Sequence, residues 1–273
     1  MNLSNKQKEE AFKTAVWKEG FPFEQRVFKL LEEKKWFILP NRYFFDSFSG
    51  RTREYDMLAV KTWKAKGLTF FLVLIIECKF NPNRIAFYSR LLDDKKYPIQ
   101  YYIGDYVNNY LQPNSISEVF EKLKKHRQIF FPKEQIFGYQ AFKEIQKSAQ
   151  NKPKNDMSAL FNAEHNFTEK TIFGGINNVI QATTYERNIR NQQVNLANLI
   201  LYFPTVVFSG ELYKASLEGE KRSLIQRHLF RYKAGMASND KNSPEDFSVH
   251  LCDIDGLEQL LKAYDYICNK FVH

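Results

Sequence analysis

The sequence predicts a mixed α/β protein whose sheet is partly antiparallel. Three observations lead to this prediction. Apolar residues recur at helical spacing over residues 22–35, strand-like segments follow up to Lys79, and a further helix and strand come only after a long interruption. The chain has 273 residues, of which 44% are hydrophobic, so it can form a substantial core.

Two helices are expected at the start of the chain. Ser4 can cap a first helix that runs to about Lys18 and ends before Gly20. Pro22 suits the first turn of a second helix over 22–35, because proline lacks the N–H that this position leaves unpaired.

Strand-like segments come next. "WFIL" and "RYFFD" lie on either side of Pro40, "REYDMLAVK" covers 53–61, and "TFFLVLIIECK" covers 69–79. The last of these segments is apolar on both faces, which is typical of a central strand. We expect a loop over 62–68 between the last two strands.

We expect a single domain over 1–273, with a large insertion at about 81–174. We expect the insertion to be mainly helical, because "FYSRLLDDKK" and "SISEVFEKLKKHRQIF" look helical. A long helix over 176–200 and a buried strand over 202–209 should follow. Later segments predict two strands and a closing amphipathic helix, namely "RHLFRYKA", "FSVHLCDI" and "DGLEQLLKAYDYICNKF".

Charged side chains end the strongest strand. Glu77 and Lys79 share one face of it, because side chains alternate along a strand. Asp56 lies among apolar residues of the preceding strand. A hairpin loop centred near Ala65 and Lys66 would pair Asp56 with a residue within two positions of Glu77. Opposed residues have Cβ atoms about 4.5–5.5 Å apart, so the two carboxylates should lie close together.

This set of residues suits metal-assisted hydrolysis of a phosphodiester. Two carboxylates so close would repel, and one would take up a proton unless a cation lay between them. Oxygen ligands completed by water suit Mg²⁺ or Mn²⁺. Lys79 can orient or deprotonate an attacking water and contact a phosphate oxygen. Glu24 lies inside the apolar arc of the 22–35 helix, so it also needs a partner.

These residues resemble the PD-(D/E)xK nuclease superfamily over residues 20–80. In that superfamily a helix with an inward Glu precedes a hairpin bearing Asp and a strand closed by Glu-x-Lys. The resemblance implies a restriction-endonuclease-like fold, a mixed sheet flanked by helices. It also implies Mg²⁺ on Asp56 and Glu77, Lys79 as the catalytic lysine, and Glu24 as the additional helix carboxylate.

A looser match lies on the later helix. Gln181 and Tyr185, within "QATTY", are similar to the QxxxY motif of RecB-like members, where both residues support the site and approach the nucleic acid. Arg187 follows and could meet a phosphate, although a solvated surface position explains it equally well. The chain also departs from the pattern: Tyr55 stands where the motif has Pro, and about a hundred residues separate Lys79 from Gln181.

Charge and composition bear on partners and location. A net charge of +9 suits a polyanion, because neutralised phosphates release counterions. The basic stretches 121–127 and 221–233 suit a nucleic-acid track or, equally, a solvated face. We expect nucleic acid, DNA foremost, as the partner, and leave a homodimer as an open option. Three scattered cysteines suit a reducing compartment, and no apolar run is long enough for a membrane span, so we expect a cytoplasmic protein.

The leading interpretation is therefore a Mg²⁺-dependent nuclease. One alternative is an inactive nuclease-like module that binds nucleic acid or a protein partner. Another is a structural protein in which Glu77, Lys79 and Asp56 form ion pairs at a strand end.

Overall fold

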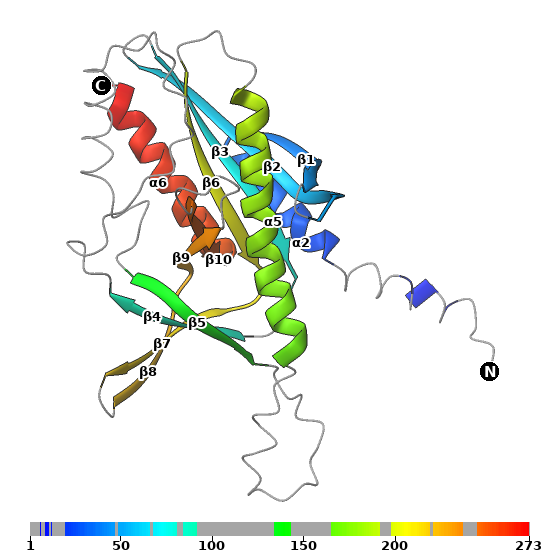
Figure 1. Ribbon diagram of the computed structural model, residues 1–273, viewed down its shortest axis with the longest axis vertical. Coiled ribbons are helices and arrows are strands. Elements are labelled where there is room, and N and C mark those ends of the chain that lie inside the picture. Colours follow the sequence, from blue (N-terminus) through cyan, green and yellow to red (C-terminus); the bar gives the residue numbers. More distant parts are fainter. Residues whose placement is uncertain are drawn as a thin grey trace, which may run out of the picture.

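The structure is a computed structural model that describes most of the two sheets and three long helices (Figure 1). The described residues are 20–46, 49–65, 68–80, 84–91, 134–142, 165–191, 198–218, 221–236 and 245–272, with a few isolated positions before them. The elements are α2 (Phe21–Glu33), β1 (Phe37–Asp46), β2 (Arg51–Ala65), β3 (Leu68–Lys79), β4 (Arg84–Leu91), β5 (Glu134–Phe142), α5 (His165–Asn191), β6 (Asn198–Phe208), β7 (Leu212–Glu218), β8 (Lys221–Gln226), β9 (Leu229–Met236), β10 (Glu245–Cys252) and α6 (Ile254–Val272).

The larger sheet has six strands in the order β1-β2-β3-β6-β10-β9. β1, β2 and β3 form an antiparallel meander, whereas β3, β6 and β10 run parallel, and β9 returns antiparallel to β10. β3 is therefore central, as its apolar sequence predicts, and every residue from Leu72 to Cys78 is buried. The carboxyl ends of the three parallel strands meet at one edge of the sheet.

Helices cover both faces of this sheet, so the mixed α/β class predicted from the sequence is confirmed. α2 and α6 pack on one face, and α5 runs along the other (Figure 1). The buried residues of α2 lie three and four positions apart and form the stripe predicted for it: Phe23, Val27 and Leu31.

A second sheet continues two strands of the first. Its order is β5-β4-β7-β8, and β4 pairs with β7 in parallel, as β3 pairs with β6. The pair β3/β6 thus turns a corner and goes on as β4/β7. Two main-chain hydrogen bonds tie this corner together: the Ser209 N–H donates to the Lys79 carbonyl at 3.1 Å, and the Ile85 N–H donates to the Glu211 carbonyl at 3.0 Å. Figure 1 shows the second sheet at the end of the first.

The described part of the insertion differs from the prediction. Residues 84–91 form β4, not a helix, because Ile85, Ala86 and Phe87 are all buried in a sheet that extends the β3/β6 pair. β5 is a second strand from the same region. The helix expected at 115–130 lies outside the described residues, as does most of the first helix expected at 4–18.

Several boundaries also differ from the predictions. α5 begins at His165 rather than 176, and it ends at Asn191 because the apolar residues that follow belong to β6, whose pairing with β3 begins at Asn198. The expected loop at 62–68 is mostly strand, since β2 extends to Ala65. β7 and β8 were not predicted, whereas β9, β10 and α6 were.

Two predictions from composition can be compared with the structure. Cys78, Cys252 and Cys268 are buried and unpaired, so they form no disulfide framework. Within the described ranges, no helix has both the length and the apolarity needed to cross a membrane.

Candidate functional site

The predicted site lies where β2 and β3 separate. Their antiparallel pairing starts beside the hairpin turn and stops at Met57 and Ile76. Beyond that point β2 remains paired with β1, and β3 remains paired with β6 as far as Lys79. The next opposed pair in this register is Asp56 and Glu77, so the predicted hairpin alignment is confirmed. We call this opening between the two strands the fork.

The Asp56 side chain takes over a main-chain role at the fork. Its Oδ2 accepts a hydrogen bond from the Cys78 N–H at 2.5 Å, where the β2–β3 ladder has ended. Burial raises the pKa of Asp56 and the neighbouring Glu54 carboxylate adds to this, while the Cys78 N–H and the Lys79 ammonium oppose the rise. Asp56 is thus held against β3 at the cost of partial desolvation.

Glu77 is the most buried carboxylate of the fork, with 7% of its surface exposed. Its Oε1 accepts a hydrogen bond from Lys79 Nζ at 2.5 Å, and its Oε2 accepts one from Asn178 Nδ2 at 2.7 Å. Burial is the main reason that the pKa of Glu77 is raised to about 7, and the Asp56 carboxylate raises it further. Lys79 and Asn178 favour the ionised form but do not outweigh burial.

The Lys79 side chain lies against α5 at Gly175. A Cβ atom on Gly175 would come within 3.0 Å of Lys79 Cε and 3.2 Å of Val206 Cγ1, both closer than ordinary contacts. The neighbouring Gly174 has nothing within 4 Å of its corresponding position. Gly175 therefore leaves the room that the Lys79 side chain occupies beside Glu77.

Glu24 approaches the fork from the α2 side of the sheet, as the position predicted for it on the helix requires. Burial raises the pKa of Glu24, and the carboxylates of Asp56 and Glu54 raise it further, while Lys79 lowers it. Glu24 and Lys79 therefore belong to one electrostatic group with Asp56. Helix α2 thus contributes one carboxylate to this group.

Two residues of the site were missed in the sequence. Glu54 is two positions before Asp56 on β2, and this spacing alone marks it as a neighbour of Asp56. Asn178 is buried among apolar residues of α5, where a polar side chain needs a partner, and that signal could have singled it out. Its Nδ2 also donates to the Glu54 carbonyl at 2.7 Å.

The residues of the QxxxY-like pattern lie on α5 but do not join the carboxylates. Among the described residues, the hydrogen-bond partners of Glu77 are Lys79 and Asn178, not Gln181 or Tyr185. The Tyr185 ring packs on Phe44, with ring centroids 6.0 Å apart. Gln181 and Arg187 are partly buried. A role in substrate binding for Gln181, Tyr185 and Arg187 stays a prediction.

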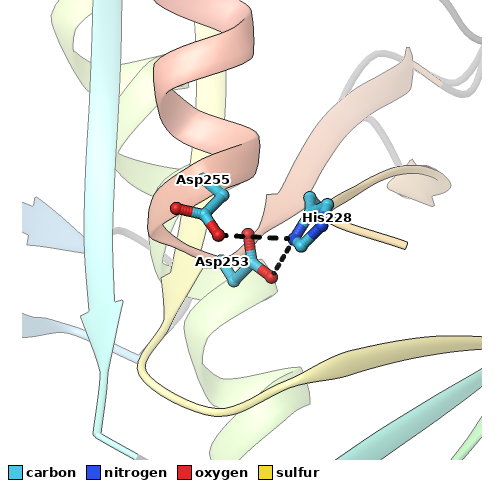
Figure 2. A group of neighbouring side chains, drawn as sticks. All are labelled: His228, Asp253 and Asp255. Carbon is cyan, nitrogen blue, oxygen red and sulfur yellow. Dashed lines mark hydrogen bonds and ion pairs between the residues drawn. The ribbon is translucent and has the colours of Figure 1, made fainter. Parts of the chain in front are cut away.

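A second cluster of ionisable groups lies at the start of α6 (Figure 2). It consists of His228, Asp253 and Asp255, which we call the α6 cap cluster. One possible ligand atom from each residue lies within 4.8 Å of the other two, and this is the group of three found within the described ranges. Asp253 Oδ1 accepts a hydrogen bond from the Gly256 N–H at 2.8 Å, and Asp253 Oδ2 lies 2.8 Å from His228 Nδ1. These contacts are those of a helix N-cap, so they account for the cluster without a metal.

The residues of the fork fit a hard divalent cation. All the acidic donors are carboxylate oxygens, and each such oxygen has two lone pairs, so Asp56 and Glu77 can accept more than the hydrogen bonds they already make. Glu24, Asp56 and Glu77 are not gathered as tightly as the α6 cap cluster. An ion at the fork would therefore be held by Asp56 and Glu77 with water, which is the coordination that Mg²⁺ favours.

Comparison of the chain with protein-family models, with curated proteins and with solved structures gave no match. The chemistry of the fork therefore carries any proposal of function.

Proposed function

We propose that the protein is a Mg²⁺-dependent nuclease that hydrolyses phosphodiester bonds at the fork, with DNA as the expected substrate. The observation that carries the proposal is an excess of negative charge in a partly desolvated place. Lys79 is the one cationic group that opposes the raised pKa of Glu24, of Asp56 and of Glu77 among the described residues. One ammonium cannot balance three carboxylates, so the site favours a further cation.

The roles of the residues follow from their contacts. Asp56 and Glu77 would hold the ion, which supplies positive charge to the phosphate oxygens and favours ionisation of water. The Cys78 N–H and the Asn178 amide hold one oxygen of each carboxylate, which limits their rotation. Lys79, hydrogen-bonded to Glu77, is held where it can orient an attacking water or contact a phosphate oxygen. Glu24 adds a carboxylate that can accept a proton.

Overall charge supports a polyanionic substrate. The chain carries +9 at neutral pH, although the fork itself is acidic. Positive charge elsewhere on the chain can therefore attract a phosphate backbone that the carboxylates alone would repel. The basic stretch at 221–233 forms β8 and part of β9, while 121–127 lies outside the described residues.

A structural ion pair is the second candidate, and one observation favours it. Lys79 Nζ lies 2.5 Å from Glu77 Oε1, so Lys79 already offsets part of the negative charge of Glu77. Among the described residues, this pair leaves Asp56 and Glu24 with no ion pair of their own. A rise in melting temperature on addition of Mn²⁺ would contradict the purely structural interpretation, because a ligand that binds only the folded state stabilises it.

The test is incubation of the protein with plasmid, linear duplex DNA, single-stranded DNA and RNA in Mg²⁺, in Mn²⁺ and in EDTA. We expect cleavage in the presence of either metal and none in EDTA, with Lys79→Ala at least about 100-fold slower than the wild type. Binding of nucleic acid in EDTA with no cleavage in either metal would favour an inactive binding module instead.

A further inference from the structure

Asn178 connects the two strands of the fork through one amide group. It lies on the buried side of α5, with 8% of its surface exposed. Its Nδ2 donates to Glu77 Oε2 on β3 and to the Glu54 carbonyl on β2, each at 2.7 Å. The ladder between β2 and β3 has already ended at Met57 and Ile76. The amide therefore replaces, from outside the sheet, a connection that the two strands no longer make.

The chemistry of this bridge suits asparagine. Both partners are acceptors when Glu77 is ionised, so the bridging group must supply two hydrogens. An amide NH₂ does so, whereas a serine hydroxyl supplies one hydrogen and an aspartate carboxylate supplies none. A glutamine would supply two hydrogens but is longer by one methylene, at a position that is only 8% exposed.

The bridge also completes the restraint of the Glu77 carboxylate. Lys79 holds Oε1 at 2.5 Å and Asn178 holds Oε2 at 2.7 Å. With both oxygens bonded, the carboxylate cannot turn about its terminal bond without losing a hydrogen bond. Since Asn178 is also tied to Glu54 on β2, the same residue sets how far apart the strands lie where Asp56 faces Glu77.

We propose that Asn178 is a positioning residue that orients Glu77 and sets the width of the fork, so that Asp56 and Glu77 present oxygens to one divalent cation. This inference rests on the proposed function. A positioning role and a merely structural role for Asn178 have different consequences. A buried amide that only satisfied the Glu54 carbonyl would affect the stability of the fold, but not the affinity of the folded protein for the ion.

The test compares Mn²⁺ affinity, by calorimetry and by electron paramagnetic resonance, between variants at two adjacent asparagines of α5. Asn178→Ala removes both donors, and Asn178→Leu removes them while keeping the volume and a good helix former. Asn177→Ala and Asn177→Leu are the matched controls, because Asn177 is exposed on the same helix. Circular dichroism at the temperature of the titration verifies that each variant is folded.

We expect the folded Asn178 variants to bind Mn²⁺ about 10- to 100-fold more weakly than the wild type, the usual cost of removing a partner that orients a metal ligand. The Asn177 variants should bind it like the wild type. Wild-type affinity in folded Asn178 variants would overturn this inference and leave the proposed function in place. Absence of Mn²⁺ binding by the wild type would overturn both.

Discussion

The fork and the α6 cap cluster lie at the same edge of the sheet, yet the surroundings of their carboxylates differ. The two regions are only two strands apart, since Val207 of β6 pairs with Cys78 on one side and with Cys252 on the other. At the α6 cap cluster, Asp253 is bonded by a helix N–H and by His228. At the fork, burial raises the pKa of Asp56 and of Glu77, and repulsion by Glu54 on Asp56 and by Asp56 on Glu77 adds to the rise.

The difference teaches that close ligand atoms do not by themselves mark a metal site. The α6 cap cluster has the tighter grouping, but its contacts complete a helix end. The fork has the looser grouping, but among the described residues three carboxylates share the one ammonium of Lys79. If this comparison is right, changes at the fork should alter metal binding and catalysis, and changes at the α6 cap cluster should alter stability alone.

The largest expected effect is on cleavage. Lys79→Ala should lower the rate by about 10²–10⁴-fold, the range for loss of a group that positions or transfers a proton. Glu77→Gln keeps the size of the side chain but removes its charge and should abolish cleavage. Asp255→Asn makes the same chemical change at an exposed position of the α6 cap cluster and should have no effect. Rates measured on one nucleic acid substrate compare the three, and equal rates would end the distinction between the two regions.

The next effect is on stability as pH changes, in EDTA. Because the pKa of Glu77 is raised from 4.5 to about 7, the folded state binds this proton more tightly than the unfolded state. The stabilisation is fully present below pH 4.5 and is lost as pH rises through 7, and it amounts to at most about 3 kcal/mol. Urea denaturation at several pH values measures it. Glu77→Gln should flatten this dependence, whereas Asp255→Asn should not, and an unchanged slope in Glu77→Gln would disprove the assignment.

A smaller effect is expected at the adjacent glycines of α5. Gly175→Ala adds a methyl group 3.0 Å from Lys79 Cε, so the lysine must shift, whereas Gly174→Ala adds one in open space. Both changes favour the helix by up to about 1 kcal/mol, so neither should lower the melting temperature much. We expect cleavage to fall about tenfold in Gly175→Ala only, equivalent to about 1.4 kcal/mol. Equal activity of the two variants would show that the position of Lys79 is unimportant.

The smallest effect is expected on stability, at the α6 cap cluster. Asp253→Ala removes the N-cap of α6 and should cost about 1 kcal/mol of stability. Cleavage and Mn²⁺ affinity should stay at wild-type values when measured well below the melting temperature. A loss of Mn²⁺ affinity in Asp253→Ala would assign the ion to the α6 cap cluster rather than to the fork.

The sequence predicted the features that depend on neighbouring residues, namely the Asp56 and Glu77 alignment and the orientation of Glu24. The alternation of a strand and the expected centre of the hairpin loop were enough to oppose Asp56 and Glu77, although the loop expected over 62–68 is mostly strand. Helical spacing was enough to turn Glu24 toward the sheet. These rules act over a few residues, so a single sequence contains them.

The parts that were missed depend on residues far apart in the chain. Residues 87–96 look helical by themselves, and β4 is a strand because it pairs with β5, about fifty residues later, and with β7, more than a hundred residues later. Asn178 reaches Glu77 because α5 packs across β3 at that point. His228 meets Asp253 because β9 and β10 are neighbours. No local pattern encodes these contacts.

The corner between the two sheets has a mechanical consequence. The strand that carries Glu77 and Lys79 continues into β4, and its neighbour β6 continues into β7, with hydrogen bonds at the corner on both sides. The chain also crosses between the two sheets from β8 to β9, through Arg227 and His228, where the Arg227 N–H donates to the Leu212 carbonyl at 2.9 Å. The second sheet is thus joined to the first beside Lys79 and beside His228, so a displacement of the second sheet would reach both the fork and the α6 cap cluster.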